Sequence, residues 1–185
     1  MKKFKIIIPT LDSDGYLPDC YGGNAPVETL INGLSYLSPE ISWEAVENAK
    51  SYALEFIDYD SASACGLIFV HWVVANIPTT KLEINASLTN KHILQGINSC
   101  TQGIYKNFEL NDDQKRISNL ENSVYVGPCP PNSDHTYTFK VYALDVEKVQ
   151  LKQPFFIGEF HLAIDSHIIA ESSINLKYRH VKNRK

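Results

Sequence analysis

The sequence lacks any concentration of positive charge. Its 17 Lys and Arg residues are outnumbered by 21 Asp and Glu residues, and the net charge is −4 with the six His counted as neutral. A nucleic-acid-binding protein needs a concentrated basic surface, because phosphate contacts dominate its affinity. The charge balance therefore argues against a nucleic-acid partner. We expect the one basic stretch, residues 177–185, to be a solvated tail.

Long apolar runs are also missing. No stretch approaches the roughly 20 apolar residues that a membrane-spanning helix needs. The apolar run near the N-terminus, Phe4–Ile8, is interrupted by Lys5 and stopped by Pro9, which makes it too short for a signal peptide. We therefore expect a cytoplasmic protein with no integral membrane association, in which residues 4–8 form a first strand.

Cysteine is scarce and irregularly spaced. The four cysteines, Cys20, Cys65, Cys100 and Cys129, show no CxxC pair, so the sequence does not predict a zinc site. Reduced thiols are the expectation for a cytosolic protein, and a secreted, disulfide-bonded form stays open. The chain also lacks a P-loop, a dinucleotide fingerprint and a Gly-x-Ser-x-Gly elbow. We predict no cofactor.

Strand patterns are what the sequence does contain. Residues 51–58 and 136–144 alternate between apolar and polar side chains, and residues 67–74 form a β-branched apolar run. Helical spacing is clear only over Phe160–Glu171. The polar stretch 101–122 shows no periodicity and is predicted to be a surface segment with room for short helical turns. The chain length fits one domain over residues 1–185, mainly β, with one or two peripheral helices.

Polar side chains stand at the ends of these apolar strands. Asp58 and Asp60 close one strand, His71 lies inside the next, and His135 and Tyr137 open the last. Each has an ordinary structural explanation: Asp-Tyr-Asp-Ser is good turn chemistry, and a lone buried histidine is commonly satisfied by a carbonyl. Together they offer donors and acceptors for a small anionic group but no obvious nucleophile. Two His and two Asp could also hold a metal, although no spacing makes this specific, and we predict none.

A larger set of short motifs resembles the phosphatidylethanolamine-binding protein family, which includes the Raf kinase inhibitor protein and a bacterial and archaeal branch. The motifs occur in the family's order, and the Gly-Pro-x-Pro-Pro to His-x-Tyr block is the most specific of them. They are Ile41-Ser42-Trp43, Asp58-Tyr59-Asp60, His71-Trp72, Gln95-Gly96-Ile97-Asn98-Ser99, Gly127-Pro128-Cys129-Pro130-Pro131, His135-Thr136-Tyr137 and Val141-Tyr142-Ala143-Leu144-Asp145.

The resemblance implies a β-sandwich-like fold with a small pocket for phosphate, acetate-like anions or phospholipid head groups. Members of the family typically act by binding ligands and protein partners, among them kinases and a serine carboxypeptidase, and show no turnover. The family's pocket residues fall on Asp58, Asp60, His71, Pro130, Pro131, His135 and Tyr137, with Tyr125 and Cys129 beside them.

Two departures from the family pattern affect this pocket. Thr136 stands where the family has an arginine that helps to hold the neighbouring acid. The family's Asp-Pro-Asp-Ala-Pro reads Asp58-Tyr59-Asp60-Ser61-Ala62 here, and the loss of both prolines predicts a looser loop.

The leading hypothesis is a non-enzymatic binding module for phosphate or a phosphorylated head group that regulates a protein partner, a kinase or a protease. We expect His71 and His135 to donate hydrogen bonds to the anion and Tyr137 to add a hydroxyl donor. Asp58 is expected to orient His71 and to favour its imidazolium form near neutral pH. The alternatives are a hydrolase that uses the Asp/His cluster as acid and base, and a protease or kinase inhibitor whose pocket is incidental. A homodimer stays open.

Overall fold

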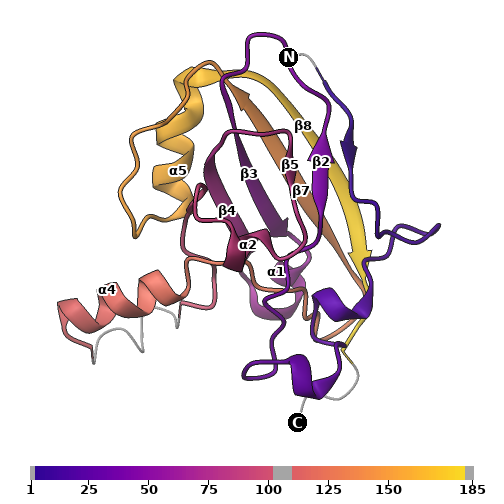
Figure 1. The fold of residues 1–185 in the computed structure, drawn as a ribbon. Helices are drawn as coiled ribbons and strands as arrows, with labels where there is room; N and C mark the ends of the chain where they lie inside the picture. Colours follow the sequence, from indigo (N-terminus) through magenta and orange to yellow (C-terminus); the bar gives the residue numbers. More distant parts are fainter. Residues whose placement is uncertain (1–2, 102–109, 182–185) are drawn as a thin grey trace.

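Two antiparallel sheets form the body of the protein in a computed structural model that describes residues 3–101 and 110–181 (Figure 1). The larger sheet has the order β6 (Leu94–Gln95), β4 (Phe69–Ile77), β3 (Ser51–Asp58), β7 (His135–Leu144) and β8 (Ile168–Tyr178). The smaller sheet has the order β1 (Ile6–Ile7), β2 (Ile41–Trp43) and β5 (Lys81–Leu82). This arrangement confirms the predicted mainly β fold.

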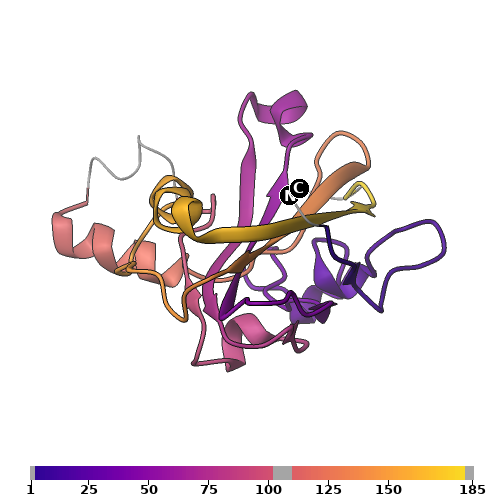
Figure 2. The same cartoon turned by 90° about the horizontal axis from the view of Figure 1, so that it is seen from above.

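Short helices lie around the sheets. The α-helices are α1 (Ser61–Cys65), α2 (Ala86–Thr89), α4 (Asp112–Glu121) and α5 (Ile157–Ile164). Single 3₁₀ turns cover η1 (Asp19–Tyr21), η2 (Val27–Thr29) and η3 (Asp165–His167). Helix α4 stands out to one side of the sheets and buries none of its residues (Figure 2).

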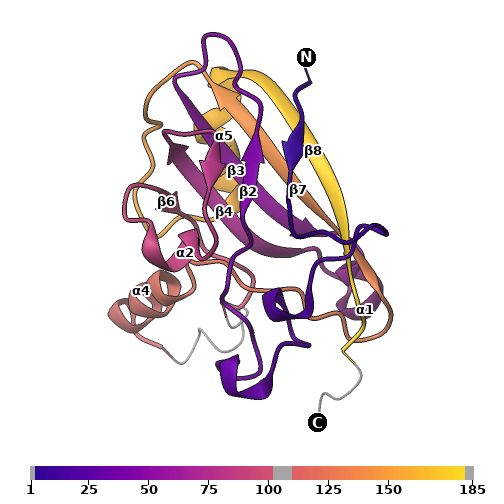
Figure 3. The same ribbon diagram turned by 45° about the vertical axis from the view of Figure 1, so that its right-hand side comes forward.

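Strand β3 is buried on both faces along its whole length. Leu54 and Phe56 face a core shared with Trp43 of the smaller sheet. Ala53, one position along, faces a second core that Phe160 of α5 completes. The smaller sheet and α5 thus cover opposite faces of the larger sheet (Figure 3). Because β3 lies in the middle of this stack, packing on both faces fixes the position of its last residue, Asp58, between β4 and β7.

The C-terminal part of the chain differs from the sequence prediction. The helix predicted over Phe160–Glu171 ends at Ile164, and residues 168–178 form strand β8 instead. This strand pairs with β7 from Leu144↔Ile168 to His135↔Tyr178. The helical spacing of apolar residues reflects only a local preference. Hydrogen bonds between β7 and β8 join segments that are separated in the sequence, and they outweigh this preference.

The predicted solvated tail is also wrong for residues 177–181. Lys177 and buried Tyr178 belong to β8. The next two residues are held at the surface, because Arg179 lies 3.3 Å from a carboxylate oxygen of Asp12 and the His180 N–H donates to Asp134 over 2.9 Å. Residues 182–185 lie outside the described residues.

The polar stretch 101–122 contains a regular helix that the sequence analysis did not predict. Helix α4 begins at a capping box in which Asn111 accepts from the Gln114 N–H and Gln114 accepts from the Asn111 N–H. Two acidic residues in the first turn complement the positive end of the helix dipole. Residues 112–121 lie on the surface, as predicted, while residues 102–109 of this stretch lie outside the described residues. Among the described residues, no helix has the length and apolar character to cross a membrane.

Trp72 is fully buried in β4, and its indole N–H donates to the Gln95 side chain over 2.6 Å. We predict that Trp72→Ala lowers the free energy of unfolding by about 3–5 kcal/mol, because it leaves a large cavity and removes this hydrogen bond. Urea unfolding followed by circular dichroism measures the loss. Leu162→Ala is the matched control, since Leu162 is 84% exposed and its truncation should change stability little. Similar losses for the two variants would contradict the packing described.

Candidate functional site

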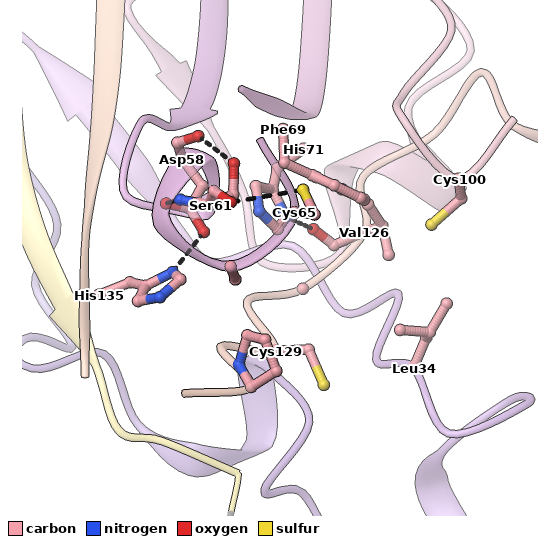
Figure 4. A pocket seen from close by; sticks show the side chains of 13 residues that line it. Leu34, Asp58, Ser61, Cys65, Phe69, His71, Cys100, Val126, Cys129 and His135 are labelled. Atoms are coloured by element: carbon pink, nitrogen blue, oxygen red, sulfur yellow. Dashed lines mark hydrogen bonds and ion pairs between the residues drawn. The ribbon is translucent and has the colours of Figure 1, made fainter. Parts of the chain in front are cut away.

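A cavity of about 270 Å³ opens at the end of the larger sheet where β3 finishes and β7 begins (Figure 4). Its walls come from the end of β3, from α1, from the first part of β4 and from the segment that precedes β7. The residues that line it are Leu34, Asp58, Ser61, Ala64, Cys65, Phe69, His71, Cys100, Val126, Gly127, Cys129, Pro131 and His135.

The Asp58 carboxylate is the organising group at the base of this cavity. It is buried, and each of its oxygens accepts a hydrogen bond: Oδ1 from the Ser61 N–H over 3.0 Å and Oδ2 from His135 Nδ1 over 2.8 Å. A buried carboxylate needs such partners because it has lost its hydration. The first bond closes the turn between β3 and α1, and the second joins the end of β3 to the start of β7.

His71 has a different partner from the one predicted. Its Nδ1 lies 2.8 Å from the carbonyl oxygen of Val126, and because a carbonyl only accepts, Nδ1 must carry the proton. Burial lowers the pKa of His71 from 6.5 to about 4, outweighing the opposing effects of Val126 and Asp58. At neutral pH the ring is therefore neutral, and its Nε2 is an acceptor. The expectations that Asp58 orients His71 and that His71 is an imidazolium near neutral pH are wrong.

His135, not His71, is the partner of Asp58. Its other ring nitrogen, Nε2, lies 2.7 Å from Oδ1 of Asn132, whose amide nitrogen donates to Ser63 over 3.1 Å. Neighbouring side chains thus engage both ring nitrogens of His135 and fix the orientation of the ring. Asn132 was not singled out from the sequence, where it reads as one more turn residue after the prolines. Its role arises only because the turn folds back over His135.

Tyr137 packs behind the two histidines. Its ring centre lies 5.2 Å from that of His71 and 6.2 Å from that of His135, and the side chain is not part of the cavity lining. Burial, together with the nearby charge of Asp58, raises the pKa of Tyr137 well above its ordinary value. The structure therefore places Tyr137 as support for the histidines and not at the cavity wall.

Asp60 also lies away from the cavity. It is exposed, and its Oδ2 accepts from the Thr136 N–H over 2.8 Å. Asp60 does not join Asp58 at the cavity, as the family resemblance had implied, because the chain leaves the extended conformation after Asp58 to begin α1. Asp60 instead ties this turn to β7 through the Thr136 N–H.

The proline segment forms one wall. Cys129 and Pro131 line the cavity, whereas Pro130 is buried behind it and its carbonyl accepts from the Val181 N–H over 3.1 Å. Tyr125, predicted to lie beside the pocket, is fully buried, and its hydroxyl donates to the Tyr21 carbonyl over 3.0 Å. Across the described part of the chain, no cluster of three or more His, Cys, Asp or Glu side chains is placed to hold a metal ion.

Comparison with known proteins shows the relationship directly. The family model described as phosphatidylethanolamine-binding protein matches residues 8–179. The chain belongs to the phosphatidylethanolamine-binding protein family. Among its relatives, the YxkA protein of Bacillus subtilis is 34% identical over 173 residues, which cover 91% of this chain and 97% of YxkA. A UPF0098 protein of Aquifex aeolicus is 33% identical over 141 residues, or 75% of this chain and 71% of that protein.

Solved structures of the family share the fold. The homologue CT736 from Chlamydia trachomatis superposes with a TM-score of 0.70 at 23% identity, covering 98% of this chain and 99% of CT736. YbcL from Escherichia coli gives a TM-score of 0.70 at 22% identity, covering 98% of this chain and all of YbcL. The predicted family and fold class are both confirmed.

The buried, neutral state of His71 predicts a dependence of stability on pH. Below pH 6.5 the unfolded chain binds a proton at His71 that the folded chain refuses until about pH 4, so the fold loses stability as the pH falls through this range. At pH 4.5 the loss due to this group is about 2–3 kcal/mol. In His71→Asn the amide can still donate to Val126 but has no such proton to bind. Urea unfolding at pH 7 and pH 4.5 should show a smaller acid loss for the variant, and equal losses would mean that folded His71 binds the proton readily.

Proposed function

We propose that this family member binds a small phosphate-like anion, either free phosphate or a phosphorylated head group, in the cavity beside α1. One observation carries the proposal: His71 is only 4% exposed and borders the cavity, and its hydrogen bond to the Val126 carbonyl engages only Nδ1 of the ring. The other ring nitrogen, Nε2, is left for a ligand or water in the cavity. Membership of a ligand-binding family agrees with this.

The electrostatic balance of the cavity supports an anion that brings a proton with it. Each oxygen of the Asp58 carboxylate already accepts a hydrogen bond, one from the Ser61 N–H and one from the His135 ring. The Nε2 atom of His71 accepts a hydrogen bond, and a phosphate monoanion carries a P–OH group that can donate one. If that proton moved to His71, the imidazolium would donate a charge-assisted hydrogen bond to the phosphate dianion. The complex would contain the same number of protons in either case.

The Asp58–His135 pair fits a structural role better than that of a catalytic base. A hydrolase built on the Asp/His pair needs an imidazole nitrogen within reach of substrate or water. Both nitrogens of His135 are already engaged, one by Asp58 and the other by Asn132. Regulation of a protein partner such as a kinase or a protease extends the proposal on the strength of the family resemblance.

The proposal predicts that ligand affinity rises as the pH falls. Methyl phosphate is a suitable probe, because phosphate monoesters lose their second proton near pH 6. We expect it to bind at least about tenfold more tightly at pH 5.5 than at pH 8, since only the monoanion can donate to neutral His71. Isothermal titration calorimetry at the two pH values measures the difference. Sulfate, which carries no proton in this range, should bind more weakly than methyl phosphate at pH 5.5.

Two histidine variants separate this site from general charge effects. His71→Asn should remove most of the affinity and its pH dependence, because the ring nitrogen that faces the cavity is lost. His167→Asn is the control, since His167 pairs with Asp145 at the surface, away from the cavity lining. Affinity that is independent of pH, or equal in the two variants, would exclude His71 from the binding site.

A further inference from the structure

Three of the four cysteines in the chain border the one cavity that holds His71. Cys65 comes from the end of α1, Cys129 from the proline segment and Cys100 from the segment that follows β6 (Figure 4). Cys20 is the exception, since it lies in a separate surface hollow with Pro26 and other residues of the N-terminal part. This clustering places three thiol groups around the cavity in which the ligand is proposed to bind.

Cys65 is the most accessible of the three. It is exposed, whereas Cys100 and Cys129 are partly buried. Its Sγ lies 3.3 Å from the carbonyl oxygen of Ser61 and 3.5 Å from that of Leu67, so the thiol is held close to the turn that positions Asp58. The helix stops directly after it, because Gly66 takes the left-handed conformation with φ of 77°. A thiol that is both exposed and part of the cavity lining can be reached by a small reagent and then extend into the cavity.

An adduct on Cys65 and a ligand near His71 would draw on the same cavity. About 270 Å³ must accommodate the phosphate-like ligand near His71, and the same space borders Cys65. Groups attached to the Cys65 sulfur would fill part of this volume. Nε2 of His71, whose ring borders the cavity, gives a polar group on the adduct a hydrogen-bond acceptor there.

We propose that Cys65 is a thiol-modification site, and that a mixed disulfide formed there with a low-molecular-weight disulfide closes the cavity to its ligand. The exposed thiol loses its proton to water, and the thiolate attacks one sulfur of the reagent. The reagent's S–S bond breaks as the new one forms, and the departing thiolate takes up a proton. Excess dithiol reverses the exchange. Control of ligand binding by this reaction rests on the proposed function.

Hydroxyethyl disulfide is the probe of choice, because its adduct is small and neutral and so acts by occupying space and not by adding charge. The full-length protein is treated with it, and peptide mass spectrometry follows adduct formation at Cys65 and Cys20 with and without methyl phosphate. We expect Cys65 to react, and methyl phosphate to slow the reaction at Cys65 at least several-fold while leaving Cys20 unchanged. Titration calorimetry should then show at least a tenfold loss of methyl phosphate affinity after treatment, restored by dithiothreitol.

Two serine variants assign the effect to one sulfur. In Cys65→Ser, treated and untreated protein should bind methyl phosphate equally, whereas Cys20→Ser should remain sensitive to treatment. An adduct on Cys65 that leaves affinity unchanged, or modification of Cys20 in preference to Cys65, would overturn the inference. If untreated protein fails to bind methyl phosphate, the proposed function fails. The modification is then judged by nuclear magnetic resonance, in which an adduct on Cys65 should shift the ring signals of His71, and unshifted signals would refute it.

Discussion

The pairing of Asp58 with His135 is the interaction on which the rest of the site depends. A carboxylate at the end of a strand that is buried on both faces must find compensating partners, or it would cost several kcal/mol. Here the Ser61 N–H and the His135 ring supply them, and in doing so they close the turn into α1 and fix the start of β7. With Asp58 occupied in this way, His71 turns to the Val126 carbonyl. The cavity lies between the Asp58–His135 pair and the His71–Val126 pair.

This division gives the two histidines different chemical roles. His135 is held through both ring nitrogens, by Asp58 and by Asn132, so it serves mainly to build the wall. His71 is held on one side only and, as a neutral ring, presents an acceptor to the cavity. A ligand that carries its own proton suits such a site better than a bare dianion does. Cys65 lines the same cavity as His71. The ring proposed to bind the ligand and the thiol proposed to block it therefore border one small volume.

Much of the fold could be predicted because its central strands are marked by local patterns. The alternation over 51–58 and 136–144 predicted β3 and β7 to within one residue. Strand β8 could not be found in this way, since its pairing with β7 is nonlocal and its residues also fit a helical spacing. Helix α4 was overlooked because it buries no side chain and so leaves no apolar stripe to detect. The assignment of one domain to residues 1–185 stays a prediction.

The sequence by itself pointed to a set of residues of which Asp58, His71, Cys129, Pro131 and His135 line the cavity, whereas Asp60, Pro130 and Tyr137 lie outside its lining. Only the tertiary structure decided how they pair. A side-chain hydrogen bond forms where a donor and an acceptor come within about 3 Å of each other, and its strength depends on how far burial excludes competing water. The spacing of residues in the sequence gives neither the distance nor the burial. For this reason the sequence did not predict that Asp58 bonds to His135 and not to His71. It also did not predict that Asn132 and Cys65 belong to the site.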